Sequence, residues 1–395
     1  MEFDVVVVGA GPSGSVAAMT ASKAGLKVLL LERGPEPGSK NVSGAMIRPT
    51  SIQNYVDLSS APVDRDVKRV DIGLFSSQGD LKVSFRPSSR LVTLSRLKFD
   101  KWLAQQAENS GATLITKTTV TGIEPSDGKK KVLTDRGIVE AKSVILSEGA
   151  NALISMALKI RPEFSPKEAV QAVKEVYSST KDDITRRFGL SGDEGVAFRF
   201  FIDYPLPSAG FLYTYKDSIS IGVGAPINFL LEKKVRPSDL LEIFKDRTGL
   251  NEIVKGMSLR EYSAKIIPEQ GFPSWKACSE GIYLTGDTIG LINPLEFNGI
   301  GPAIASGFLA GKSVANSSSC YEYEKSLYQD KEISEVIRAR PLVRELLKPE
   351  KMSTYINLFP RLMNSWISGN LTDSGVRQFL PKIAKDLILS FGVIG

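Results

Sequence analysis

The sequence predicts an α/β protein that combines a discontinuous parallel-sheet domain, an inserted antiparallel-sheet α+β domain and a helical C-terminal region. Three features support this prediction. A run of valines enters a glycine-rich turn within residues 4–14, a second strand enters a Gly-Asp turn at residues 286–287, and alternating strands occupy much of the chain between them. Buried parallel strands read as continuous apolar runs, whereas strands with one solvated face alternate.

The composition restricts the chemistry that this chain of 395 residues can perform. It contains no histidine, which excludes Ser-His-Asp and Cys-His triads. Its two cysteines, Cys278 and Cys320, are far apart in the sequence, so they form neither a CxxC redox motif nor a four-cysteine iron–sulfur site. Without histidine, a zinc site of the common kind is also disfavoured. Redox chemistry would therefore depend on a bound organic cofactor.

The charge balance is mildly basic. The chain carries 50 Lys and Arg against 44 Asp and Glu, a net charge of +6. This excess permits contact with an anionic membrane surface or an acidic partner, but no basic run indicates nucleic-acid binding. No stretch approaches the length of a membrane-spanning helix, and the first strand begins by Phe3, which leaves no room for a signal peptide. We expect a cytoplasmic protein, with peripheral contact to the inner face of the cell membrane as an open alternative.

The turn after the first strand has the pattern Gly-x-Gly-x-x-Gly. Val5 to Val8 predict a buried parallel strand, and the helix after the turn is expected to end near Gly25. In this pattern the first glycine makes the tight turn, the second lets the backbone approach a pyrophosphate, and the third lets the helix pack closely. The helix start offers N–H groups and a positive dipole end to phosphate. The residues assigned to this site are Gly9, Gly11, Pro12, Ser13 and Gly14.

The second predicted strand adds an acidic residue at the expected distance. Residues 27–31 form this strand, which ends at Glu32 and is followed by Arg33. Glu32 is placed to accept hydrogen bonds from an adenosine ribose, and Arg33 is assigned to the same site. A lone Gly-x-Gly-x-x-Gly is weak evidence. The succession of strand, turn, helix, strand and acid in register makes a dinucleotide site the favoured interpretation.

A second half-site lies near the other end of the chain and distinguishes FAD from NAD. A strand over residues 281–285 leads into Gly286 and Asp287, and a long helix of small residues follows from about Pro302. Asp287 can bind a ribityl hydroxyl, and the helix start can direct N–H groups at the flavin pyrimidine edge, where the dipole stabilises negative charge on the reduced ring. The residues assigned to that start are Gly299, Ile300 and Gly301. FAD needs this second half-site and NAD does not, so the sequence predicts a Rossmann-like FAD-binding domain.

Two middle segments are consistent with this domain. A helix beginning after Ser95 carries an apolar stripe, and Arg96 at its start either reaches the pyrophosphate or is a solvated helix-start arginine. Alternating strands then begin near Val120, turn at residues 127–128 and end at Gly149, where the backbone can touch the cofactor. Val120 and Gly149 are assigned to the site with Arg96.

These residues carry a resemblance to known proteins. Gly-x-Gly-x-x-Gly, Glu32, Arg96, Gly149 and Gly286-Asp287 together are similar to the glutathione-reductase-like flavoprotein superfamily. Within it, four stretches resemble FixC, the bacterial and archaeal relative of electron-transfer flavoprotein–quinone oxidoreductase. They span most of the chain: GSKNVSGAMI (38–47), AVKEVYSSTKDDITRRFGLSGDEGVA (172–197), GFLYTYKDSISIGVG (210–224) and LREYSAKIIPEQG (259–271).

The resemblance implies a route for electrons. Reduced electron-transfer flavoprotein would pass them to this FAD, and from there they would go to a ferredoxin-like iron–sulfur protein and to quinone. The mitochondrial enzyme has its own iron–sulfur cluster, whereas in FixC systems the cluster belongs to a small separate protein. The shortage of cysteines agrees with the second arrangement, and the lack of histidine agrees with electron transfer that needs no acid–base side chain.

Some positions depart from the family pattern or are assigned by their polarity. This chain has Ser147-Glu148-Gly149 where the family usually has Ser-Ala-Asp/Glu-Gly, and Asn298 where relatives often carry Arg or Lys, which bears on the flavin potential. The segment KNVSGAM is expected at the flavin's dimethylbenzene or reactive side, because its polar groups adjoin a glycine where backbone can pass close to a ring. A plain surface loop stays open for its lysine. The residues assigned are Lys40, Asn41, Ser43 and Gly44.

The motifs predict three regions along the chain. The FAD-binding domain is expected to comprise residues 1–70, 90–155 and 275–325, and the sheet domain on the substrate or quinone side residues 71–89 and 156–274. In that sheet, Phe211, Tyr213 and Tyr215 either alternate as ordinary strand residues or wall a quinone or prenyl pocket. Residues 326–395 are expected to be helical. A stripe over residues 376–388 either packs on the domain or lies in a membrane interface.

Three rival functions share this fold. A geranylgeranyl (prenyl lipid) reductase typically shows a cysteine near Ser43 and Gly44 and a Trp-x-Phe-Pro signature, neither of which is present. A flavin monooxygenase prefers Asp-Gly where this chain has Glu148-Gly149, and consumes NADPH. Prenyl-protein escort factors use the fold without flavin chemistry. A flavin spectrum in the purified protein would exclude the escort class.

Overall fold

The computed structural model describes residues 2–39, 44–293, 296–346 and 348–369. The Cα atoms group into two compact units, each assembled from three segments. The first unit comprises Met1–Val63, Leu94–Ala169 and Lys265–Ile337, and the second comprises Asp64–Thr93, Val170–Ala264 and Arg338–Gly395. These units begin and end at other residues than the expected domains, and the domain assignment itself stays a prediction.

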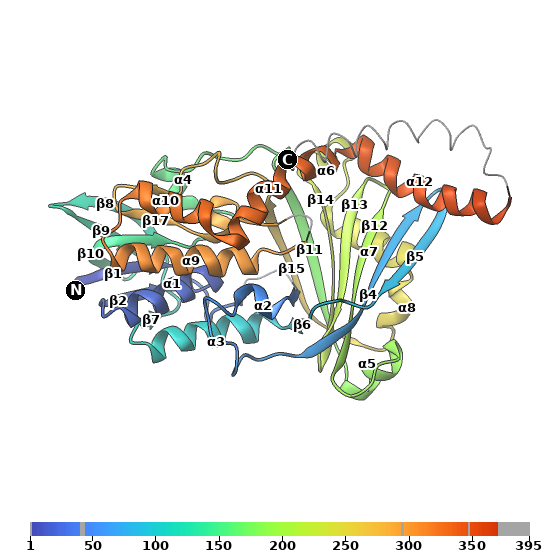
Figure 1. Ribbon diagram of the computed structural model, residues 1–395, viewed down its shortest axis with the longest axis horizontal. Helices are drawn as coiled ribbons and strands as arrows, with labels where there is room; N and C mark the ends of the chain where they lie inside the picture. Colours follow the sequence, from blue (N-terminus) through green and yellow to red (C-terminus); the bar gives the residue numbers. More distant parts are fainter. Residues whose placement is uncertain (1, 40–43, 294–295, 347, 370–395) are drawn as a thin grey trace. The chain divides into compact units, whose positions relative to one another are not determined.

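A largely parallel sheet forms the centre of the first unit (Figure 1). Its strands lie in the order β16-β17-β10-β1-β2-β7. The central strands are continuous apolar runs because both of their faces are covered. Strands β8 and β9 extend β10 as an antiparallel meander. The bounds are β1 Glu2–Val8, β2 Val28–Leu31, β7 Thr113–Ile115, β8 Val120–Ser126, β9 Lys129–Thr134, β10 Gly137–Leu146, β16 Cys278–Ser279 and β17 Ile282–Leu284.

Three helices pack together beside this sheet. Helix α1 (Pro12–Lys23) lies against both α3 (Arg96–Asn109) and α9 (Ile300–Ala315) (Figure 1). The contact with α9 is made backbone to backbone: a Cβ atom placed on Gly307 would lie 2.1 Å from the carbonyl oxygen of Ser13. Only glycine allows so close an approach. The helix of the first half-site, α1, is therefore held directly against the helix of the second half-site, α9.

The second unit is built on a curled sheet. Its strands lie in the order β15-β11-β14-β13-β12-β4-β6, with β5 paired to β4. The pairs β11–β14, β14–β13, β13–β12, β4–β5 and β4–β6 are antiparallel, whereas β12 and β4 run parallel. The bounds are β4 Arg65–Ser76, β5 Gly79–Phe85, β6 Leu91–Leu94, β11 Ala169–Ser178, β12 Glu194–Ile202, β13 Ser208–Thr214, β14 Ser218–Pro226 and β15 Ser258–Pro268.

Helices and one buried arginine complete the second unit. Side chains such as Phe200, Leu212 and Phe244 form its apolar core between sheet and helices. The fully buried Arg65 donates hydrogen bonds to the carbonyl oxygens of Tyr215 and other residues on separate elements. The helices are α5 Lys181–Phe188, α6 Ile227–Lys233, α7 Pro237–Thr248, α8 Leu250–Val254 and α12 Pro349–Ile367.

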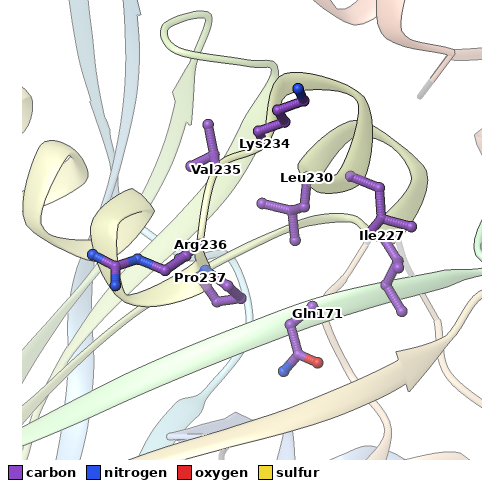
Figure 2. A pocket seen from close by; sticks show the side chains of 8 residues that line it. Gln171, Ile227, Leu230, Lys234, Val235, Arg236 and Pro237 are labelled. Atoms are coloured by element: carbon purple, nitrogen blue, oxygen red, sulfur yellow. The ribbon is translucent and has the colours of Figure 1, made fainter.

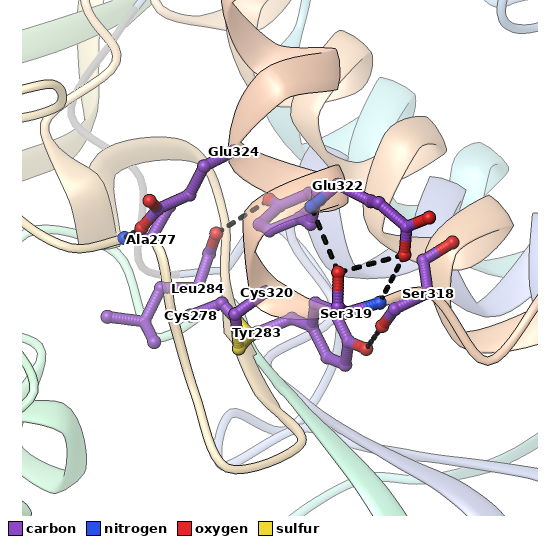
Figure 3. The surroundings of a disulfide bond; sticks show 10 residues. Ala277, Cys278, Tyr283, Leu284, Ser318, Ser319, Cys320, Glu322 and Glu324 are labelled. Atoms are coloured by element: carbon purple, nitrogen blue, oxygen red, sulfur yellow. Dashed lines mark hydrogen bonds between the residues drawn. A yellow bond between two sulfur atoms is a disulfide. The ribbon is translucent and has the colours of Figure 1, made fainter.

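A disulfide bond joins Cys278 to Cys320, which the sequence analysis had not predicted (Figure 3). It links β16 to the first residue of α10 (Cys320–Gln329). The hydroxyl of Tyr283 also donates to the carbonyl oxygen of Ser318 over 2.6 Å. These bonds fasten the helix after the second half-site to the edge of the sheet. The remaining elements are β3 Ala45–Ile47, α2 Pro49–Ile52, α4 Leu153–Ala157, a 3₁₀ turn at Gly286–Ile289 and α11 Lys331–Leu346.

The predicted fold class is confirmed: an α/β chain with a parallel sheet, a curled antiparallel sheet and helices toward its C-terminus. Two details differ. Helix α9 begins at Ile300, before Pro302, and the pair β12–β4 in the curled sheet is parallel. The apolar stripe expected over residues 376–388 lies outside the described residues. In the part of the chain that is described, no helix has both the length and the apolar character to cross a membrane.

Candidate cofactor site

The three glycines of the turn after β1 differ in the space around them. A Cβ atom on Gly9 would lie 2.3 Å from the carbonyl oxygen of Ser147, and one on Gly14 would lie 1.8 Å from the carbonyl oxygen of Gly9. Both positions are closed by the protein itself. Around a Cβ atom on Gly11, by contrast, there is no other atom within 4 Å, and its φ of −75° suits any residue. Space is therefore left open in front of Gly11 alone.

The start of α1 is buried but has no side-chain cap. Pro12, Ser13 and Gly14 are all buried, and a buried helix start normally has its N–H groups satisfied by a side chain, by water or by a ligand. Together with the open space at Gly11, this is the arrangement that receives an anionic phosphate group. The geometry fits the pyrophosphate of a dinucleotide.

Glu32 follows β2 and is held by two backbone groups. The N–H of Ala10 donates to its Oε2 over 3.0 Å, and the N–H of Gly34 donates to its Oε1 over 2.6 Å. An ionised carboxylate has about four acceptor positions, so these bonds orient it and leave positions for hydroxyl groups of a ribose. The side chain is partly buried at the end of the strand, as the motif requires.

The second half-site is in direct contact with the first. Gly286 has a φ of +60°, and a Cβ atom there would lie 3.0 Å from Ser13 Oγ. Next to it, Asp287 Oδ2 lies 3.8 Å from Lys265 Nζ. The same lysine nitrogen is 3.6 Å from the position of a Cβ atom on Gly149. The structure therefore brings Gly149, Asp287 and the Gly-x-Gly-x-x-Gly turn together within the first unit.

The N–H groups at the start of α9 were expected to be free for the flavin, but two of them are already hydrogen-bonded within the protein. The side-chain oxygen of Asn298 accepts hydrogen bonds from the N–H groups of Ile300 and Gly301, over 3.0 and 3.2 Å. The N-cap residue Gly299 has no side chain, and the asparagine one residue earlier supplies the oxygen that an N-cap side chain would otherwise offer. Asn298 therefore occupies two of the donors that the sequence analysis assigned to the flavin, although the dipole of the helix is unaffected.

A buried arginine lies close to the turn at Gly149. Arg161 is 1% exposed and donates to the carbonyl oxygen of Ala150 over 2.8 Å, while its guanidinium lies over the rings of Phe164 and Trp275. Two of its nitrogen atoms have no hydrogen-bond partner among the described residues. Burial lowers the pKa of Arg161, and nearby Glu148 and Asp287 oppose this effect. An incompletely paired cation thus adds positive potential beside the turn at Gly149.

Glu148 has a structural partner of its own. Its carboxylate accepts hydrogen bonds from the N–H groups of Ile154 and Ser155 at the start of α4. Burial raises the pKa of Glu148 to about 7, against the lowering effect of these bonds and of Arg161 and Arg33. Arg33 is exposed and is the weakest of these lowering effects.

The other assigned residues lie at varied distances from this centre. Arg96 is not solvated, because it forms a two-point ion pair with the buried Asp100 at 2.8 Å. Val120 is buried at the start of β8, and Gly44 directly precedes β3. Lys40, Asn41 and Ser43 lie outside the described residues. The pyrophosphate contact of Arg96 stays a prediction.

A hollow of about 470 Å³ in the second unit lies beside α6 and the turn that follows it (Figure 2). Its lining is mainly aliphatic, and Arg236 on its edge is already paired with Asp239. Among the described residues there is also no group of three or more metal-ligating side chains. The site around the three glycine motifs is therefore the candidate.

Comparisons with known sequences agree with an FAD site. A family model for FAD dependent oxidoreductases matches residues 4–154. FixC of Rhizobium meliloti (strain 1021) is 35% identical over 329 residues, which cover 80% of this chain and 76% of that protein. A probable electron transfer flavoprotein-quinone oxidoreductase of Escherichia coli (strain K12), YdiS, is 32% identical over 387 residues, which cover 92% of this chain and 90% of that protein.

Solved structures share the fold. A geranylgeranyl bacteriochlorophyll reductase-like protein from Thermoplasma acidophilum matches with a TM-score of 0.73 at 21% identity, over 91% of both chains. The flavin-dependent brominase Bmp2 matches with a TM-score of 0.69 at 17% identity, over 95% of this chain and 93% of that one. At these identities the likeness concerns the fold alone. The sequence relatives are closer: the chain belongs to the FixC and electron-transfer flavoprotein–quinone oxidoreductase family and is an FAD-dependent oxidoreductase.

Proposed function

We propose that this protein accepts electrons from a reduced electron-transfer flavoprotein and passes them through FAD to a ferredoxin-like iron–sulfur protein, to quinone, or to both. The kinship with FixC and with YdiS carries this proposal. The cysteines add support, because both are joined in one disulfide and none remains to ligate a cluster on this chain. This arrangement is consistent with a separate partner that carries the cluster.

The chain's own residues would hold the cofactor at both ends. The turn at Gly11 and the uncapped start of α1 would receive the pyrophosphate, Glu32 the adenosine ribose, and Asp287 the ribityl chain. Lys265 would keep Asp287 oriented. When bound, FAD supplies reversible uptake of electrons. The protein's contribution is then binding, orientation and the electrostatic potential around the ring.

The test is anaerobic mixing of the FAD-loaded protein with reduced electron-transfer flavoprotein from the same organism, followed at flavin wavelengths. We expect reduction of the bound FAD at a rate that falls as salt rises, because electron carriers associate through weak, partly electrostatic contacts. A parallel sample receives a geranylgeranyl lipid and a chemical reductant. Saturation of the lipid, with no response to the flavoprotein, would replace the proposal with a prenyl reductase.

A matched pair of controls separates specific from adventitious electron transfer. Protein freed of FAD should give no signal, and readdition of FAD should restore it. A third sample with NADPH and oxygen tests the monooxygenase alternative, and steady NADPH consumption there would favour that class. Reoxidation of the reduced protein by a ferredoxin-like partner or by a quinone analogue then identifies the acceptor.

We also propose that the protein contacts a membrane surface, which suits delivery of electrons to a lipid-soluble quinone. Four exposed apolar side chains on α12, Phe359, Met363, Trp366 and Ile367, recur at helical spacing. With a net charge of +6, attraction to anionic lipid would add to their insertion. When vesicles containing anionic lipid are sedimented, the wild type should be found in the pellet and Trp366→Asp in the supernatant. Equal sedimentation of both would remove α12 from the contact.

A further inference from the structure

A buried carboxyl group lies directly beside the start of α9. Glu332, the second residue of α11, is 8% exposed. Its Oε2 atom lies 2.7 Å from the position that a Cβ atom on Gly301 would occupy, and Asn298 Nδ2 lies 3.2 Å from the same point. Glycine at residue 301 is therefore what makes room for the carboxyl. Both groups belong to the first unit.

The Glu332 carboxyl has no hydrogen bond or ion pair among the described residues. The charged groups that face it come from several elements: Arg48 before α2, Glu296 before α9, Asp330 at the end of α10 and Glu335 on α11. Arg48 is already paired with Glu296 at 2.7 Å. Asp330 is likewise engaged, since it accepts a hydrogen bond from the Tyr55 hydroxyl over 2.7 Å. Arg48, the cation that opposes these carboxylates, is thus shared with one of them.

These surroundings favour the protonated form. Burial raises the pKa of Glu332 to about 7, and the neighbouring carboxylates Glu335, Glu296 and Asp330 contribute in the same direction, while Arg48 opposes them. A glutamate side chain in water has a pKa well below 7 and is therefore ionised at neutral pH. Near pH 7 the group can therefore gain or lose a proton when a charge changes nearby.

The start of α9 is also where charge would change during the reaction. A helix start carries a positive partial charge that stabilises one anion close to it. Glu332 and the pyrimidine edge of a reduced flavin would both draw on the same helix start. Two negative charges at close range in a partly buried site disfavour each other, so one of them is expected to take up a proton.

We propose that Glu332 takes up a proton when the bound FAD is reduced, so that electron entry at this site is coupled to proton uptake by this residue. The proposal rests on the placement of the flavin edge at the start of α9. For two electrons supplied by an external donor, the cofactor itself takes one proton above pH 7, and the Glu332 carboxylate takes a second from solvent. Reoxidation returns both protons and both electrons. Glu332 touches no reacting atom. Its protonation removes a negative charge from the surroundings of the reduced flavin, and in this sense it is a positioning residue.

The test is the midpoint potential of the purified, FAD-loaded protein between pH 7 and 8.5, measured against indicator dyes with a chemical reductant. Each proton taken up per two electrons changes the equilibrium constant tenfold per pH unit, or about 30 mV. We expect a slope of about 60 mV per pH unit in the wild type and about 30 mV in Glu332→Gln. Glu335→Gln, which removes an equal charge one helical turn further on, should keep the steeper slope.

A second measurement covers the case in which Glu332→Gln fails to retain FAD. Proton uptake by the wild type, followed with an indicator in lightly buffered solution, should approach two protons per two electrons in the same pH range. One proton per two electrons, or equal slopes in the wild type and Glu332→Gln, would overturn the proposal. Neither measurement involves the electron-transfer flavoprotein, so failure here is distinct from failure of the proposed electron route.

Discussion

Replacing Gly11 and Gly14 separately by alanine adds the same methyl group at two places in one turn, with opposite expected results. At Gly11 the new Cβ atom meets no protein atom within 4 Å, and the backbone (φ −75°, ψ −175°) is one that alanine adopts freely. Because alanine restricts the unfolded chain more than glycine does, the FAD-free protein should unfold with a free energy about 0.4–1 kcal/mol higher. The methyl group would, however, occupy space assigned to the pyrophosphate.

At Gly14 the protein itself occupies the space. The new Cβ atom would lie 1.8 Å from the carbonyl oxygen of Gly9, far inside van der Waals contact, and the backbone would have to move. Overpacking of this kind costs about 1–3 kcal/mol and more where backbone must shift, so we expect Gly14→Ala to lose at least about 3 kcal/mol with or without FAD.

The assay is urea unfolding of each variant with FAD removed and again with FAD in excess, alongside titration of FAD by fluorescence. Gly11→Ala should combine unchanged or higher FAD-free stability with an affinity for FAD at least about tenfold weaker, or 1.4 kcal/mol. Ligand binding raises apparent stability with the logarithm of the affinity, so the stability that added FAD gives Gly11→Ala should be smaller than in the wild type. Wild-type FAD affinity in Gly11→Ala, or wild-type stability in Gly14→Ala, would refute this interpretation of the turn.

Three further outcomes follow from described contacts. Arg65→Met should destabilise the protein by more than about 3 kcal/mol in urea, because it leaves buried carbonyl groups without their donor, whereas Arg90→Met, at an exposed ion pair, should change stability by less than about 1 kcal/mol. Burial raises the pKa of Glu269 to about 7, so wild-type stability should fall relative to Glu269→Gln as pH rises from about 4.5 to 7, by at most about 3 kcal/mol, whereas below that range the difference between the two should not change with pH. Because only one Gly-x-Gly-x-x-Gly follows a strand, NADH or NADPH alone should leave the flavin oxidised under anaerobic conditions, and rapid bleaching would show a nicotinamide site.

The elements with local signals could be predicted from the sequence. The strand, turn and helix of residues 2–23 follow from an apolar run and glycine spacing, and the meander of β8 to β10 from alternation and an Asp-Gly turn. The parallel pairing of β12 with β4 could not be predicted, because strands more than 100 residues apart in sequence leave no local pattern for their register. The same holds for the disulfide, since two cysteines carry no information on their separation in space.

The site shows a similar division. Glycine positions are dictated by close backbone approach, which the motif encodes, so their spacing was informative. Arg96 and Asp100 are four residues apart on a helix, a spacing that predicts an ion pair and that the pyrophosphate interpretation overlooked. The cap formed by Asn298 could have been read from its place just before α9. The position of Glu332 could not be predicted, because it depends on a contact between α11 and α9, and α10 separates these helices in the sequence.

The contact between Gly307 and Ser13 has a consequence for how the protein is made. One half-site is complete within the first 32 residues, but the surfaces that close around it come from β10, from β17 and from α9, which ends at Ala315. At synthesis rates of about 5–20 residues per second, the N-terminal turn would wait about 15 to 60 seconds for its counterpart. The strand β1 gains its neighbour β2 almost at once and its other neighbour β10 when Leu146 has been made, so only the surfaces from β17 and α9 come late. FAD can therefore be captured only late in translation or after it, once β17 and α9 have been made.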